Sequence, residues 1–154
     1  AAVLGPRVVR AAGETGWLEA ARTSPLVYVC PLLKDGSESR CHGEVWYFVD
    51  GGDVVLATAT KTWKARALAA GRDRARVWVG DFGPYAKAAE KLSSAPSFVA
   101  RASIDKDRAT FDRLLAAYAV KYPDEWDKWK PRFESSYADG TRVLIRYRAG
   151  TGAK

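Results

Sequence analysis

The chain has 154 residues and a formal net charge of +7, because 25 lysines and arginines outnumber 18 aspartates and glutamates. A hydrophobic content of 47% beside 28% charged residues excludes wholesale disorder and fibrous repeats, so we expect residues 1–154 to form a single domain. Charges, glycines or prolines interrupt every apolar run, which argues against a membrane span, and the apolar block at 1–4 is too short for a secretory signal. We therefore expect a cytoplasmic protein without membrane contact.

The first part of the chain predicts a short helix followed by three strands. Thr15 can cap the helix with its hydroxyl, and the Asp35-Gly36 dipeptide is a strong signal for a hairpin between the first two strands. A second glycine-containing turn at 50–53 joins the second strand to the third. The expected elements are a helix over 14–22 and strands over 26–33, 39–49 and 54–58.

The rest of the chain predicts helices between further strands. A stripe of apolar side chains, spaced as on a single helix face, follows Asp105 and Asp107, either of which can cap that helix. The stripe consists of Phe111, Leu114, Leu115 and Tyr118. The expected elements are helices over 60–70, from 105–107 onward and from 123 to near 131, strands over 76–81, 97–104 and 141–148, and a polar link at 83–95. Consecutive hairpins indicate a mainly β protein with α-helices, in which an antiparallel barrel or sheet has helices at its ends.

Few residues could carry hydrolytic or metal chemistry. The single histidine, His42, has no serine in a nucleophile elbow to activate, and the sequence contains no glycine-rich phosphate loop. Cys30, Cys41 and His42 are one ligand short of a closed zinc site, so no metal site is predicted. If Asp35-Gly36 forms a two-residue turn, Cys30 faces Cys41. The geometry would then allow a disulfide, although two reduced thiols are favoured in a cytoplasmic protein.

Most of the positive charge lies in one stretch. Residues 61–76 contain six basic residues and one acidic residue, and so carry five of the seven net charges. A solvated helix face explains such a run about as well as a binding site does. The position favours binding, because hydroxyl and lysine side chains gather where a strand ends and a helix begins, and such junctions attract phosphate. These side chains are Thr58, Thr60, Lys61, Thr62 and Lys64.

The same junction resembles a known family. Residues 54–68 are similar to the segment that binds the flavin phosphate in the pyridoxamine 5′-phosphate oxidase-like split-barrel family. The residues in register with the family pattern are Thr58, Thr62, Lys64 and Leu68. Residues 40–52 resemble the family strand whose backbone lies along the isoalloxazine ring, and the resemblance extends over 20–148. Trp63 replaces a basic residue of the oxidase proper, His42 replaces an arginine, and no counterpart of the oxidase's C-terminal Arg/His motif is found, so vitamin B6 oxidation is not expected.

The resemblance implies an antiparallel split β-barrel with peripheral helices, and a homodimer with its cofactor at the subunit interface. It implies FMN, or the deazaflavin coenzyme of one family branch, and hence a flavin- or deazaflavin-dependent oxidoreductase acting on a small molecule. Lys64 and Lys61 would hold the cofactor phosphate, with threonine hydroxyls and amides as further donors. The implied cofactor-binding residues are Val45, Trp46 and Tyr47 at the ring edge, and Thr58, Ala59, Thr60, Lys61, Thr62, Trp63 and Lys64 around the phosphate. No catalytic residue is assigned.

Two other functions stay open on the residues alone. The basic stretch 61–76 together with exposed tryptophans would suit a nucleic-acid-binding module. The chain has no recognised nucleic-acid motif, however, so we do not expect this partner. A barrel that carries a cofactor without turnover is the other alternative.

Overall fold

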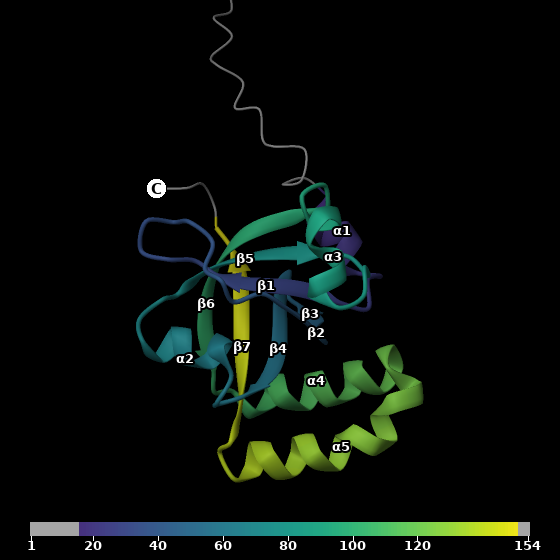
Figure 1. Cartoon of the computed structure of the whole chain (residues 1–154). Helices are drawn as coiled ribbons and strands as arrows, with labels where there is room; N and C mark the ends of the chain where they lie inside the picture. The colour runs from purple at the N-terminus through teal and green to yellow at the C-terminus, as the bar shows by residue number, and fades with distance from the viewer. Residues whose placement is uncertain (1–15, 151–154) are drawn as a thin grey trace, which may run out of the picture.

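The computed structural model describes residues 16–150, in which one antiparallel sheet of seven strands curls into a split barrel (Figure 1). The strands are β1 (Val27–Pro31), β2 (Gly43–Val45), β3 (Phe48–Asp50), β4 (Asp53–Ala59), β5 (Arg74–Val79), β6 (Ser97–Asp105) and β7 (Arg142–Ala149). The helices are α1 (Trp17–Ala21), α2 (Trp63–Ala69), α3 (Tyr85–Leu92), α4 (Arg108–Lys121) and α5 (Pro123–Ala138). Neighbouring strands follow the order β2-β1-β5-β6-β7-β4-β3. The expected antiparallel, mainly β fold with peripheral helices is confirmed.

The split in the barrel lies at Trp46-Tyr47, which we call the crossover. We expected one strand over 39–49, but the structure divides it into β2, which pairs with β1, and β3, which pairs with β4. These two short strands are the two edges of the sheet. The ladder is interrupted because the C-terminal end of α4 and the residue after it bind the main chain of Tyr47. The Tyr122 hydroxyl accepts its N–H at 3.1 Å, and Lys121 Nζ donates to its carbonyl at 2.9 Å.

The hairpin between β1 and β2 has a different register from the expected one. Val29 pairs with Gly43, and an isolated bridge joins Leu32 to Glu38, so a two-residue turn that places Cys30 opposite Cys41 is wrong. The loop is longer because the Leu33 N–H donates to the Ser37 carbonyl at 2.8 Å. Both cysteines are free, and Cys30 is buried with its thiol 3.5 Å from the Ser39 carbonyl oxygen.

Local signals placed most helices correctly. The carboxylate of Asp107 accepts the Ala109 N–H at 3.0 Å and caps α4, as expected. The proposed cap Thr15 lies outside the described residues. The link at 83–95 contains α3, whose Ala88 and Leu92 pack on the outer face of β1 and β5. No helix within residues 16–150 has both the length and the apolarity needed to cross a bilayer.

Helix α5 continues through Pro131 to Ala138, although we expected it to end near this proline. Proline removes one backbone hydrogen bond from a helix interior. Packing beyond the proline outweighs that loss, because Phe133 is buried and the rings of Phe111 and Tyr137 stack with centroids 3.8 Å apart.

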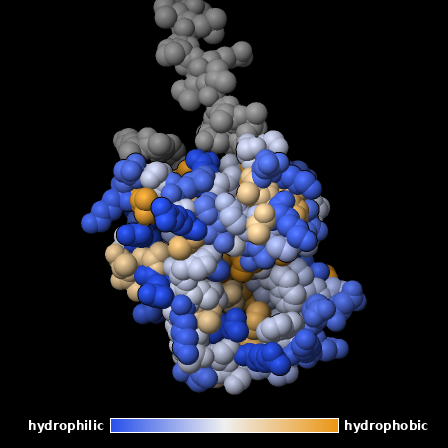
Figure 2. All heavy atoms as spheres, viewed as in Figure 1, coloured by the Kyte–Doolittle hydropathy of each residue, from blue (hydrophilic) through white to orange (hydrophobic). Residues whose placement is uncertain are grey.

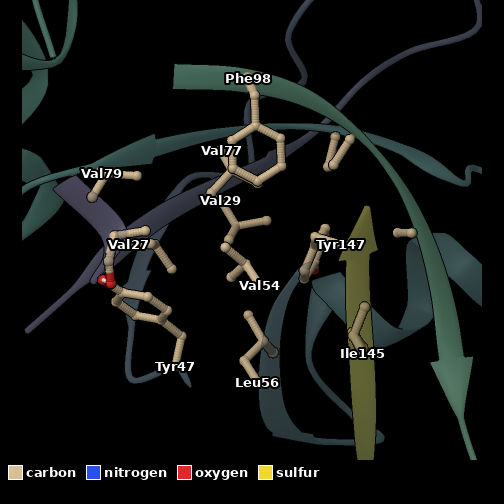
Figure 3. Packing of buried hydrophobic residues seen from close by; sticks show 14 residues of the cluster. Val27, Val29, Tyr47, Val54, Leu56, Val77, Val79, Phe98, Ile145 and Tyr147 are labelled. Carbon is tan, nitrogen blue, oxygen red and sulfur yellow. Dashed lines mark hydrogen bonds between the residues drawn. The ribbon is translucent and has the colours of Figure 1, made fainter. Parts of the chain in front are cut away.

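The buried side chains form three clusters. The largest fills the inside of the barrel (Figure 3) and includes Val27, Val29, Tyr47, Val54, Leu56, Val77, Val79, Phe98, Ile145 and Tyr147. A second lies between the outer face of β3, β4 and β7 and the helices α4 and α5, and a third lies beneath α3. The face of the molecule in Figure 2 is mostly hydrophilic, with apolar residues in a hollow between the barrel and α4 and α5.

The second cluster contains a buried hydroxyl group, that of Tyr118. The hydroxyl of Tyr118 is buried and makes no hydrogen bond among the described residues. A buried hydroxyl without a partner contributes no net stability, so Tyr118→Phe should change the free energy of unfolding by less than about 1 kcal/mol, or raise it. Urea denaturation followed by circular dichroism measures this. A loss of more than about 2 kcal/mol would show that the hydroxyl is bonded after all.

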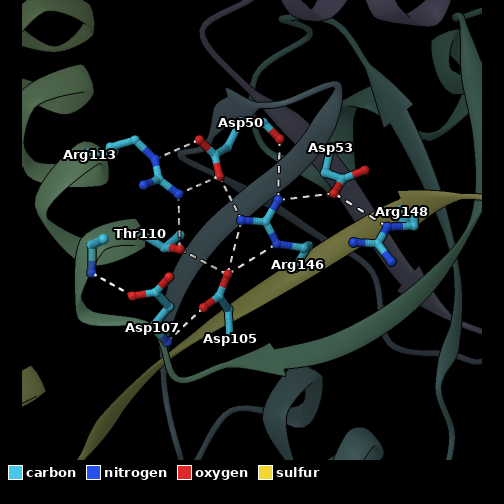
Figure 4. Close-up of polar contacts among 9 residues, drawn as sticks. Asp50, Asp53, Asp105, Asp107, Thr110, Arg113, Arg146 and Arg148 are labelled. Atoms are coloured by element: carbon cyan, nitrogen blue, oxygen red, sulfur yellow. Dashed lines mark hydrogen bonds and ion pairs between the residues drawn. The ribbon is translucent and has the colours of Figure 1, made fainter.

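An ion-pair cluster ties the β3–β4 turn and α4 to the outer face of β7 (Figure 4). Arg146 Nη2 lies 2.6 Å from Asp50 Oδ2 and 2.9 Å from Asp105 Oδ2. Its Nη1 lies 3.0 Å from Asp53 Oδ2, and Arg113 of α4 binds Asp50 at 2.8 Å. Burial opposes the charge on Arg146, but hydrogen bonds to the three carboxylates raise its pKa. Arg148 lies 3.5 Å from Asp53, so three arginines face three aspartates and the cluster balances its own charges while it joins these elements.

Candidate cofactor site

The strand-to-helix junction lies where β4 ends and α2 begins, and its hydroxyls hold the turn. Thr62 Oγ1 donates to the Ala59 carbonyl at 3.0 Å and accepts the Ala65 N–H at 3.5 Å, which caps α2. Thr58 is buried, and its hydroxyl lies 2.8 Å from that of Thr62. Because the Thr62 proton goes to Ala59, Thr58 is the donor of this bond. Both hydroxyls are thus engaged inside the junction.

Lys64 is the half-buried cation of this junction. Its Nζ lies 4.3 Å from the centre of the Trp63 ring, and no carboxylate of the described residues lies within 4.0 Å of it. Burial lowers the pKa of Lys64, and the charge of Glu44 partly opposes that effect. Lys61 is exposed at the same junction, and Thr60 is exposed with its N–H bonded to the Thr141 carbonyl at 2.9 Å. An anion beside Lys64 would supply the charge partner that residues 16–150 do not provide within 4.0 Å.

The junction meets β2 at Gly43. A Cβ atom at Gly43 would lie 3.2 Å from a ring carbon of Trp63, so the indole covers this glycine closely. Trp63 also packs against the cluster inside the barrel. The structure thus brings together the two segments that the family resemblance singles out, with Lys64 within electrostatic reach of Glu44 on β2.

The three residues predicted at the ring edge have different environments. Val45 is half-buried against the barrel interior. The Trp46 ring stacks on Tyr122 with centroids 4.2 Å apart. Tyr47 is 0% exposed, and its hydroxyl donates to carbonyls in the α1–β1 segment. The Tyr47 main chain is engaged by α4, whereas the N–H and C=O of Trp46 bond to no residue within 16–150. Only Trp46 offers free main-chain groups at the crossover.

His42 stands where the family oxidase has an arginine, and aromatic packing holds it. Its ring stacks on Tyr85 with centroids 4.5 Å apart, and its Nε2 lies 3.4 Å from Glu38 Oε2. These residues and Trp78 line a small cavity of about 180 Å³. The ring is therefore positioned by its neighbours.

Two residues at the crossover were missed by sequence reasoning. Lys121, the last residue of α4, and Tyr122, which follows it, both bind the main chain of Tyr47. A signal was available, because Lys121 lies seven residues after Leu114 and three after Tyr118, and so continues the apolar stripe. A lysine at such a position is half-buried, and burial lowers the pKa of Lys121 to about 7.

No family model and no curated protein matches the sequence. Among solved structures, a conserved hypothetical protein from Mycobacterium tuberculosis is 21% identical, with a TM-score of 0.59 over 91% of this chain and 84% of that one. A protein from Listeria innocua, provisionally assigned as a pyridoxamine 5′-phosphate oxidase, is 12% identical, with a TM-score of 0.56 over 87% of this chain and 90% of that one. The chain has the pyridoxamine 5′-phosphate oxidase-like split-barrel fold.

Other proteins with this split-barrel fold differ in what they bind. The haem storage protein HutZ from Vibrio cholerae is 14% identical, with a TM-score of 0.54 over 87% of both chains. An FAD-binding protein from Mesorhizobium loti is 12% identical, with a TM-score of 0.55 over 88% of both chains. Identities in this range show the fold and leave the cofactor to the residues of the site.

The residues present fit the phosphate end of a flavin. Lys64 is a half-buried cation without a carboxylate within 4.0 Å among the described residues, which suits a bound phosphate. The free main chain of Trp46 suits the polar edge of a flavin ring. The Trp63 indole already covers Gly43, so the space over this glycine is taken by the protein's own side chain.

Proposed function

We propose that this protein is a flavin-dependent oxidoreductase that binds FMN and acts on a small molecule. The observation that carries the proposal is Lys64, a half-buried lysine at the junction where the family resemblance places the cofactor phosphate. No carboxylate in the described part of the chain lies within 4.0 Å of it. The fold it shares with an FAD-binding protein supports a flavin. The deazaflavin coenzyme would use the same phosphate contact and is the alternative.

In this proposal the chain binds and orients, and a bound flavin would supply hydride transfer at its ring. Lys64 and the exposed Lys61 neutralise the phosphate. Thr58 and Thr62 keep the junction in shape through their mutual hydrogen bond. The main-chain N–H and C=O of Trp46, which bond to no residue within 16–150, would be available to the polar edge of the ring. The exposed side of the site would be covered by the second subunit of a homodimer.

Cofactor titration of the purified full chain tests the proposed function. FMN fluorescence should be quenched stoichiometrically on binding, and the bound FMN should be reducible and reoxidisable without loss from the protein. The deazaflavin coenzyme and haem are titrated in parallel, because one solved relative stores haem. Stoichiometric haem binding without uptake of either flavin would contradict the proposal.

Removal of the Lys64 amine should weaken FMN binding. Lys64→Ala deletes a charge-assisted hydrogen bond, so the Kd should rise roughly 10- to 150-fold, which corresponds to about 1.5–3 kcal/mol. Lys64→Arg should retain most of the affinity, since it keeps the charge. The matched control is Lys91→Ala on the exposed face of α3, which should bind FMN like the unmodified protein. An unchanged Kd for Lys64→Ala would refute the assignment of this lysine.

A further inference from the structure

A groove of about 330 Å³ lies beside the crossover, between the barrel and the turn that joins α4 to α5. One part of its wall is apolar and consists of Pro25, Leu26, Trp46 and Pro123. The rest consists of Asp81, Lys121, Tyr122, Asp124 and Glu125. Grooves of this volume accept small molecules, and an apolar wall with a few polar groups is their usual composition.

Lys121 is the unusual group of the groove. Its Nζ lies 3.3 Å from the centre of the Tyr47 ring and donates to the Tyr47 carbonyl at 2.9 Å. No carboxylate within residues 16–150 approaches it to 4.0 Å, although three acidic residues line the same groove. A half-buried lysine without a counter-charge is costly for folding, and buried groups with shifted pKa values cluster at functional sites.

The two tyrosines beside Lys121 do not supply the negative charge that would pair with its ammonium group. Burial lowers the pKa of Lys121 to about 7, and no acidic residue counteracts that effect. Burial also raises the pKa of Tyr47 to about 12 and that of Tyr122 still further, so both phenols stay neutral near pH 7. The remaining charged groups at the groove are the carboxylates of Asp81, Asp124 and Glu125.

We propose that this groove binds a small monocarboxylate with an apolar or aromatic body. The carboxylate pairs with the ammonium group of Lys121, and the body lies against Trp46 and the two prolines. Lys121 offers one positive charge, so a second negative charge on the ligand would have no cationic partner in the groove and would face only its acidic side chains. The site requires no bound cofactor, so it stands whether or not the chain binds a flavin.

The test titrates 3-phenylpropionate into the full chain without cofactor by isothermal calorimetry at pH 6. The carboxylate should bind, whereas 3-phenyl-1-propanol and the dianion phenylsuccinate should bind at least tenfold more weakly. Lys121→Met should lose at least tenfold in affinity, and Lys121→Arg should retain most of it. The control Lys128→Met, on the exposed face of α5, should bind like the unmodified chain. Thermal unfolding of each variant establishes that it is folded.

The pH dependence gives a second readout that a merely apolar groove would lack. The ligand stays ionised between pH 6 and 8.5, while Lys121 loses its proton near pH 7, so affinity should fall roughly 30-fold over that range. Saturating ligand should in turn raise the pKa of Lys121 measured by NMR. Equal affinity at both pH values, equal binding of the alcohol, or unaltered binding to folded Lys121→Met overturns the proposal.

Discussion

Replacement of Arg146 by methionine is expected to lower the free energy of unfolding by about 3–5 kcal/mol, the range for removal of one partner from a buried ion pair. The Arg146 side chain is only 15% exposed, and it binds Asp50, Asp53 and Asp105 at once. Its removal leaves three carboxylates close together with too few cations. Arg113 continues to neutralise Asp50, which keeps the loss within this range. Urea denaturation at pH 7 measures the difference.

Arg148 provides the matched control, because it lies two residues further along the same strand. Its side chain is 71% exposed and makes, among residues 16–150, a single ion pair, at 3.5 Å to Asp53. Exposed ion pairs contribute about 0–1 kcal/mol, so Arg148→Met should change stability by no more than that. Equal losses for the two variants would show that β7 tolerates no change at its outer face and that the Arg146 cluster has no special role.

The same cluster fixes the direction of the pH dependence. Hydrogen bonding from Arg113 and Arg146 lowers the pKa of Asp50 below 3.8. The pKa of Asp105 is also lowered: burial opposes the shift, but donors that include the Asp107 N–H and Arg146 outweigh it. A carboxyl with a lowered pKa in the folded state stabilises the fold above its unfolded value and loses this contribution as pH falls. The difference in the free energy of unfolding between the unmodified chain and Arg146→Met should therefore be largest near pH 7. It should become smaller below pH 3.8.

Local signals were sufficient where a single element decides the outcome. The apolar stripe and the Asp107 cap define α4, and both are confirmed because they depend on residues within one or two turns. The crossover was not predictable in this way. The strand breaks at Tyr47 because Tyr122, 75 positions later, accepts its N–H. No sequence pattern within residues 39–49 predicts that contact.

The candidate site was likewise only partly predictable from the sequence. Lys64 was identified from its position at the junction, and the structure adds that it is half-buried beside Trp63 without a carboxylate within 4.0 Å in the described part of the chain. The resemblance implies that the threonine hydroxyls bind the same phosphate, whereas in the structure the side chains of Thr58 and Thr62 bond to each other. Sequence spacing places a residue near a site, whereas its hydrogen-bond partners decide whether its side chain is free to act there.

At Tyr47 the role implied by the family resemblance can be compared directly with the position of the side chain in the structure. The resemblance places it at the edge of the cofactor ring, whereas the structure buries its ring inside the barrel with the hydroxyl donating to the carbonyls of Ala21 and Ser24. Tyr47→Ala should therefore lower the free energy of unfolding by about 3–5 kcal/mol, as for other buried aromatic rings. Chemical denaturation followed by tryptophan fluorescence measures this loss.

Tyr47→Phe separates the packing of the ring from the hydrogen bonds of the hydroxyl. It keeps the ring that Lys121 Nζ covers but leaves the carbonyls of Ala21 and Ser24 without this donor, so the loss should be about 1–3 kcal/mol. FMN affinity of this variant should stay unchanged, because the hydroxyl faces α1 and its side chain is 0% exposed. A Kd that rises while stability is preserved would place Tyr47 at the ring after all. A fall in stability at constant Kd assigns it to the fold, and it leaves Trp46 as the crossover residue whose main chain can meet a cofactor.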